Sequence, residues 1–146
     1  MDRLSGARIV AVARACIDAP FRIQGRHPAT GLDCIGLIVW VGRQVDIVLE
    51  DRRDYTLSSA SDELVAGLLG AGLLPSPDPA QGDVVLFRFD AQRRHLGIAS
   101  DTGLIHAHAG LRRVCEHRLE PDWRAAVEAC FRYPGISLSG EPAWRP

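Results

Sequence analysis

Hydrophobic positions follow two different periods along this chain. In residues 4–18 apolar side chains recur every three or four positions, which predicts an amphipathic helix. Residues 34–50 open with an apolar run directly after Asp33, a good N-cap, and favour a buried helix. The β-branched side chains of this segment leave a strand open as the alternative. A third helix is predicted over residues 61–72.

After a proline-rich linker at residues 75–83 the period changes to two. Short apolar runs separated by turn signals then predict antiparallel strands at residues 84–89, 95–100, 103–109, 112–119 and 127–134. Helices followed by a sheet are the order of an α+β fold. With 146 residues, the chain fits one domain, 1–146, and its tail, 135–146, is expected to lie on the surface.

Charge and apolar run lengths narrow the range of partners. The formal net charge is −1, which gives no overall field to attract nucleic acid or an anionic membrane. The longest apolar run, residues 35–41, is far shorter than the roughly 20 residues of a membrane span. Charged residues interrupt the first apolar segment, so it lacks the core of a signal peptide. We therefore expect a chain made in the cytoplasm without a signal peptide and with no membrane or nucleic-acid partner.

Cys34 is the first residue with candidate chemistry. It follows Asp33 at the predicted start of a helix, where unpaired N–H groups and the helix dipole favour a thiolate. The same N–H groups could stabilise an oxyanion beside the sulfur, and Gly36 permits close approach of another backbone. Four scattered cysteines without a CxxC pair indicate free thiols in a reducing compartment. The alternative is a buried, inert cysteine.

Three histidines lie on two neighbouring predicted strands. Alternation places His95 on one face with Gly97 and Ala99, small residues that would leave room beside the imidazole. His106 and His108 share a face of the next strand, and a short turn at residues 101–103 would bring His106 towards His95. A base imidazole needs such a partner to fix its tautomer. Solvated strand histidines are the alternative.

The same residue types are also zinc ligands, so a site built from the three histidines and Cys34 or Cys115 is a competing interpretation. Structural zinc sites normally show closely spaced ligand pairs, and a lone His-x-His is a weak signal of this kind. The sequence therefore favours chemistry without a metal or an organic cofactor.

Four segments together resemble the NlpC/P60 family of cysteine peptidases. TGLDCIGLIVWV resembles the DCSGLV-type nucleophile motif, and PAQGDVVLFRF resembles the PGD segment that precedes the histidine strand. RHLGIAS resembles the HVGIY motif, and LIHAHAG resembles the segment with the third catalytic residue. The similarity extends to phage-type members of the family, which gene-transfer-agent clusters also encode. The segments that resemble theirs are DCIGL, RRVCEHRLEPDW and ACFRYPG.

The resemblance implies a papain-like α+β domain with Cys34 as nucleophile, His95 as base and His106 as orienting residue. It also implies hydrolysis of a peptide bond in the peptidoglycan stem, between D-glutamate and diaminopimelate, without a cofactor. The implied partners are stem peptides and, for phage-type members, phage-like tail proteins that carry the enzyme to the periplasm.

Two positions depart from the family pattern. Ile35 replaces the usual serine after the nucleophile, and Phe21 replaces a tyrosine that often contacts the site. Candidate substrate contacts, with the two arginines as forks for carboxylates, are Phe21, Arg22, Gln24, Arg26, Asp33 and His108. Two alternatives remain at this stage: a catalytically weak tail module of the same fold, and a related thiol amidase or acyltransferase.

Overall fold

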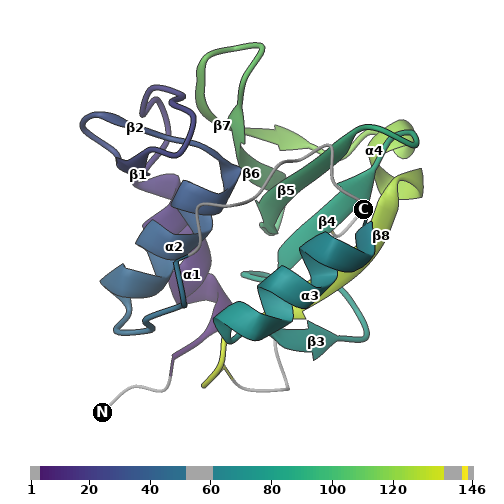
Figure 1. The fold of residues 1–146 in the computed structure, drawn as a ribbon, viewed down its shortest axis with the longest axis horizontal. Coiled ribbons are helices and arrows are strands. Elements are labelled where there is room, and N and C mark those ends of the chain that lie inside the picture. Colours follow the sequence, from purple (N-terminus) through teal and green to yellow (C-terminus); the bar gives the residue numbers. More distant parts are fainter. Residues whose placement is uncertain (1–3, 52–60, 137–142, 145–146) are drawn as a thin grey trace.

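The computed structural model describes residues 4–51, 61–136 and 143–144, and Figure 1 shows their arrangement. The helices are α1 (Gly6–Arg14), α2 (Cys34–Gln44), α3 (Ser61–Ala71) and α4 (Pro121–Ala125). The strands are β1 (Arg26–His27), β2 (Gly31–Leu32), β3 (Leu74–Ser76), β4 (Val84–Arg88), β5 (Arg94–Ala99), β6 (Gly103–His108), β7 (Arg113–Arg118) and β8 (Val127–Arg132).

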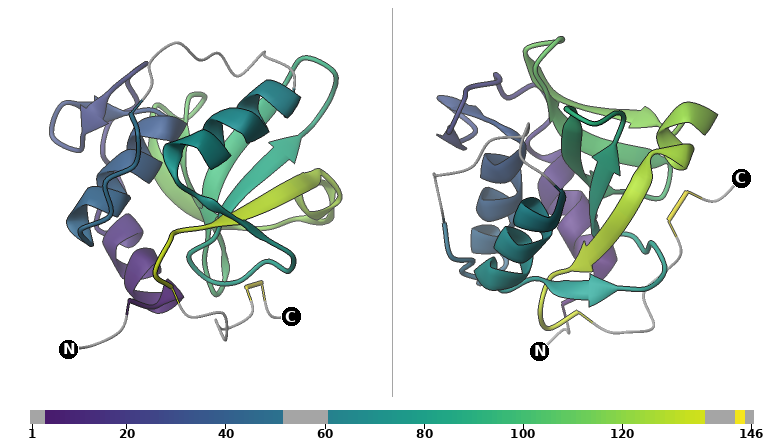
Figure 2. Two further views of the ribbon diagram at one scale, coloured as in Figure 1. Left: turned by 60° about the horizontal axis from the view of Figure 1, so that its bottom comes forward. Right: turned by 45° about the vertical axis from the view of Figure 1, so that its right-hand side comes forward.

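One antiparallel sheet of six strands, in the order β3-β8-β4-β5-β6-β7, organises the fold, while β1 and β2 form a small separate pair. Helices α1, α2 and α3 gather on one side of this sheet, as Figure 2 shows. The predicted α+β class is confirmed, and so are the three N-terminal helices and the five strands of the second half.

The two faces of the sheet bury different sets of side chains. The face towards α1, α2 and α3 carries Leu86, Leu96, Ile98, Ile105 and Ala107, all at most 1% exposed. This is the main core, and it also holds Tyr133, whose hydroxyl donates to the carbonyl of Ile38 at 2.7 Å. Burial of these apolar side chains supplies most of the driving force that fixes α2 against β5 and β6.

The opposite face carries Phe87, Ala99 and Leu104, covered by Trp123 of α4 and by Trp144. Trp144 belongs to the predicted surface tail, yet its indole N–H donates to the carbonyl of Gly103 at 2.7 Å, so this part of the tail packs on the sheet. Apart from residues 143–144, the tail after Ile136 lies outside the described residues. Antiparallel pairing places His95 opposite Phe87 and therefore on this face.

Helix α2 is shorter than the predicted helix over residues 34–50, which is a correction. It ends at Gln44, and Asp46 takes the left-handed conformation with φ 62°. The N–H of Ile47 then donates to the carbonyl of Gly42 at 2.8 Å, which closes the helix as a C-cap does. The remaining apolar residues, such as the buried Leu49, reach the core from a non-helical segment.

The linker prediction for residues 75–83 is wrong at its start, because Ser76 and Pro75 belong to β3 and pair with β8. β3 is an edge strand, where a residue without an N–H is tolerated. The linker ends at Asp83, a buried carboxylate that accepts hydrogen bonds from Ser76 and from Arg132 at 2.7 and 3.0 Å.

No helix in the described ranges is both long and apolar enough to cross a bilayer.

Candidate active site

Asp33 organises the loop before α2, confirming its prediction as the N-cap. Its carboxylate accepts from the N–H of Gly36 at 2.8 Å, the expected N-cap bond, and from the N–H of Gln24 at 2.7 Å. The same carboxylate pairs with the Arg26 guanidinium at 3.2 Å. One buried side chain therefore ties the preceding loop to the first turn of the helix that carries Cys34.

Gly36 is required by this close contact between loop and helix. A Cβ atom at position 36 would lie 1.9 Å from the carbonyl oxygen of Gly25. Only glycine lets the loop backbone approach the helix this closely. The glycine of the DCIGL segment is thus needed for the close approach of the Gly25 backbone. This close approach holds the loop beside Cys34.

Cys34 is the first residue of α2 and is 2% exposed. Burial, and then the negative charge of Asp33, raises the pKa of the Cys34 thiol to about 12. Hydrogen bonds from the backbone N–H groups of Ile35 and Cys34 act in the opposite direction but are weaker influences. The predicted thiolate is therefore not the resting form: desolvation outweighs the helix N-terminus, and the free protein holds a neutral thiol.

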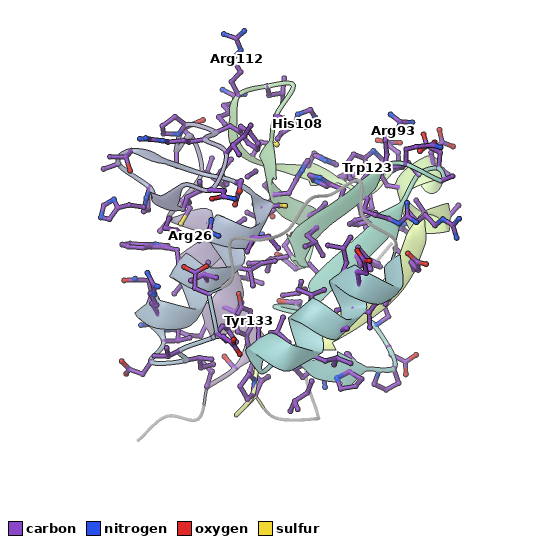
Figure 3. The ribbon with its side chains drawn as sticks, viewed as in Figure 1. Arg26, Arg93, His108, Arg112, Trp123 and Tyr133 are labelled. Atoms are coloured by element: carbon purple, nitrogen blue, oxygen red, sulfur yellow. The ribbon has the colours of Figure 1, made fainter. Side chains whose placement is uncertain are left out.

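A cleft of about 440 Å³ opens where the start of β5 and the end of β6 meet the N-terminus of α2. Its lining residues are Phe21, Cys34, Phe89, Gln92, Arg93, Arg94, His95, His106, Ala107, His108, Ala109, Gly110 and Trp123. Residues from four separate parts of the sequence thus share one cavity. Figure 3 labels His108, Trp123 and Arg93 at this end of the molecule and Tyr133 at the other.

His95 and His106 are directly hydrogen-bonded, with 2.5 Å between His95 Nε2 and His106 Nδ1. This confirms the predicted approach of the two side chains across neighbouring strands. Nδ1 is therefore the ring nitrogen of His95 that this hydrogen bond does not use. Within the described chain no hydrogen bond joins His95 to Cys34, although both line the cleft.

His95 lines the cleft, but the space that the sequence predicts over its neighbour Gly97 is filled. A Cβ atom on Gly97 would lie 2.6 Å from the Leu104 side chain, so Leu104 fills the position that the glycine leaves. His106 occupies the other side of the His95 ring. The small residues on this face serve close packing between β5 and β6.

Burial keeps both imidazoles neutral. It is the first cause that lowers the pKa of His95 to about 4 and that of His106 to about 2. The other histidines nearby act in the same direction, because each would repel a second positive charge. His106 is 0% exposed, whereas His108 lies at the cleft wall and accepts the N–H of Leu111 at 3.1 Å.

Two aromatic side chains that are not among the predicted site residues complete this cluster. His117 of β7 lies with its Nε2 2.8 Å from Nε2 of His106. Trp123 contacts the rings of His95, His106 and His117 edge to face, with centroids 5.8, 5.4 and 4.9 Å away. A signal for α4 existed in Glu120-Pro121-Asp122, since proline at the first helical position and an acid in the first turn mark a helix start.

The candidate substrate residues divide into two groups. Phe21 and His108 line the cleft, whereas Arg22, Gln24, Arg26 and Asp33 are not part of its described lining. The Arg26 side chain is 8% exposed and pairs with Asp33 and Asp51, so it holds the loop together. Arg93, which was not predicted, lines the cleft with a side chain that is 73% exposed and paired with Asp90.

Among the described residues, no group of three or more His, Cys, Asp and Glu side chains has an arrangement suited to a metal ion.

A cysteine at a helix N-terminus, facing a cleft shared with histidines of an antiparallel sheet, places this structure in the papain-like α+β class. The chain belongs to the NlpC/P60 family, whose family model matches residues 18–131. The family resemblance drawn from the sequence motifs is thereby confirmed. A comparison with curated proteins gives no significant match.

Solved structures with this fold include the NlpC/p60 domain of the peptidoglycan hydrolase SagA, with 25% identity and a TM-score of 0.62. That match covers 88% of this chain and 98% of the SagA domain. An NLP/P60 lipoprotein-like protein of Staphylococcus aureus Mu50 (22% identity, TM-score 0.60) and an NlpC/P60 protein of Bacillus cereus ATCC 10987 (16%, 0.62) share the fold. These two matches cover 94% and 90% of this chain, respectively, but only 45% and 41% of the two longer proteins.

Proposed function

We propose that this protein is a cysteine peptidase that hydrolyses peptide bonds of the peptidoglycan stem, with Cys34 as nucleophile, His95 as base and His106 as orienting residue. The single observation that carries the proposal is the cleft, which joins the helix-start cysteine to the hydrogen-bonded His95–His106 pair. Family membership and the SagA domain, itself part of a peptidoglycan hydrolase, support the substrate class.

The reaction starts from a neutral thiol and a neutral imidazole. As the sulfur of Cys34 attacks the scissile carbonyl, its proton passes to Nδ1 of His95, because Nε2 is held by His106. His95 then gives that proton to the departing amine, leaving a thioester. Water, deprotonated by the same imidazole, hydrolyses the thioester to a free carboxylate and restores the thiol.

The first turn of α2 supplies the groups that stabilise the oxyanion. The N–H of Gly36 is used by Asp33, whereas the N–H groups of Cys34 and Ile35 point to the sulfur. They therefore lie beside the attacking sulfur, within reach of the carbonyl oxygen that becomes negative as the carbonyl carbon turns tetrahedral. Phe21 lines the same cleft and offers an apolar wall without a hydroxyl donor.

Arg93 is the cleft residue best suited to a carboxylate of the stem peptide. Its guanidinium is exposed at the cleft, and its partner Asp90 is also exposed, so exchange for a substrate carboxylate costs little. Arg93 lines the cleft, whereas Arg22 and Arg26, for which the sequence predicts the same role, are not among the described lining residues. Cleavage between D-glutamate and diaminopimelate is the specificity proposed here on the family resemblance.

Mass spectrometry of muropeptides after incubation with the purified protein tests the function. We expect new fragments with a free carboxylate, no such fragments with Cys34→Ala or His95→Ala, and full activity in the presence of a chelator. A new amide in place of the carboxylate would indicate the acyltransferase alternative. Wild-type cleavage by Cys34→Ala would overturn the proposal.

Absence of any cleavage by a folded wild-type protein would instead favour the tail-module alternative. Association with phage-like tail proteins and delivery to the periplasm stay predictions of the sequence resemblance. Co-purification of the chain with particles from a producing culture would test them.

A further inference from the structure

His117 extends the His95–His106 pair into a chain of three imidazoles. Its Nε2 lies 2.8 Å from Nε2 of His106, and its Nδ1 lies 2.8 Å from the carbonyl oxygen of Arg118. Cys115 Sγ is a further neighbour of His106 Nε2 at 3.6 Å, a weak partner by comparison. The chain runs from the cleft, which His95 lines, across β6 to β7, and it ends on a backbone carbonyl.

When all three imidazoles are neutral, that carbonyl determines where every proton of the chain lies. A carbonyl oxygen only accepts hydrogen bonds, so Nδ1 of His117 must carry the proton. In the neutral ring Nε2 of His117 is then a lone pair and must receive the N–H of His106 Nε2. His106 Nδ1 is consequently a lone pair as well and receives the N–H of His95 Nε2.

The last ring nitrogen, Nδ1 of His95, is left without a proton. We propose that His117 is a positioning residue of the active site, which uses the Arg118 carbonyl to impose on His95 the tautomer able to accept the Cys34 proton. The inference rests on the proposed function only where it identifies Nδ1 of His95 as the acceptor of the Cys34 proton. The reverse order of protons would place an N–H on Nδ1 and leave the thiol without a base.

The surroundings of the three rings maintain this order. Trp123 covers all three imidazoles edge to face, and His106 is fully buried, so water does not compete for the middle of the chain. His117 belongs to β7, paired with Gly103–His108 of β6, so the rings are held by strand register. None of the three is on a flexible connection between elements of the sheet.

Nitrogen-15 NMR of histidine-labelled protein tests the proposal without any substrate. We expect His95 and His106 as the Nε2–H tautomer and His117 as the Nδ1–H tautomer, each assigned with single variants. Because this measurement needs no turnover, it can fail while the peptidase proposal stands. A His95 with its proton on Nδ1 would overturn the inference.

Two variants of His117 separate positioning from packing. His117→Gln keeps an acceptor for the His106 N–H, whereas His117→Phe keeps an aromatic ring against Trp123 and removes the acceptor. We expect kcat to stay within about 3-fold in the Gln variant and to fall roughly 10-fold or more in the Phe variant, with KM unchanged in both. The tautomer of His95 should become mixed only in the Phe variant.

Equal losses in both variants, or an unchanged His95 tautomer in His117→Phe, would show that His117 only fills space. If His117→Phe fails to fold, the tautomers of the wild-type protein and of His117→Gln still test whether His117 sets the tautomer of His95. A Gln variant with a mixed or inverted His95 tautomer would then contradict the proposal.

Discussion

His95 Nε2 and His106 Nδ1 lie 2.5 Å apart, and the two rings stand at 85° to each other. A hydrogen bond of this length fixes both the rotation of the His95 ring and the nitrogen that it turns away from His106. The pair is buried against Trp123, so it is also held in its neutral form. The predictions below follow from this geometry and from the loop that positions Cys34.

The first prediction concerns the pH dependence of hydrolysis. His95 must be neutral to accept a proton, and burial lowers its pKa to about 4. Activity should therefore persist as pH falls below 6.5, the ordinary histidine value, and decline only as pH falls through about 4. Profiles of kcat/KM on one muropeptide would show this. An acid limb centred near pH 6.5 would contradict the burial argument.

Trp123 should control the position of that acid limb. Trp123→Ala would admit water to the histidine rings, reduce the desolvation that favours the neutral form, and raise the pKa of His95 from about 4 towards the ordinary histidine value. The matched control is Trp123→Phe, which keeps an apolar ring over the cluster. Ionisation of the substrate would give the same limb in all three proteins, so a limb that does not move in Trp123→Ala would refute this role.

His106 and His108 should differ sharply in their importance. His106→Ala removes the hydrogen bond that orients His95, and we expect kcat to fall on the order of 100-fold, less than in Cys34→Ala. His108→Ala removes an acceptor for the Leu111 N–H in an exposed turn and should cost only a few-fold. Assays of both variants on the same muropeptide decide the matter, and the reverse order of losses would exchange their roles.

Gly36→Ala should damage both stability and activity. The added Cβ would meet the Gly25 carbonyl at 1.9 Å, so the loop must move away from Cys34, at a cost of about 1–3 kcal/mol of unfolding free energy. Gly67→Ala in α3 is the matched control, because nothing lies within 4 Å of its Cβ. That variant should be stabilised by up to about 1 kcal/mol. Denaturant unfolding measures both changes, and equal stabilities for the two variants would exclude the clash.

The sequence by itself determined the α+β order, the N-cap at Asp33 and the strands that carry His95 and His106. These features depend on neighbouring residues: periodicity selects the element, and a cap bonds to a backbone group three residues away. The pairing of His95 with His106 was also within reach, because a tight turn sets the register of consecutive strands.

Only the tertiary structure decided the charge state of Cys34 and the full extent of the histidine chain. The helix N-terminus favours a thiolate locally, but burial by distant segments outweighs it and keeps the thiol protonated. His117 joins the site because β7 pairs with β6, and Trp123 joins it because α4 packs against the sheet. No local pattern indicates which polar or aromatic side chain will be buried in this way. Desolvation is a property of the assembled fold, and it determines here which groups are neutral and which nitrogen can act as a base.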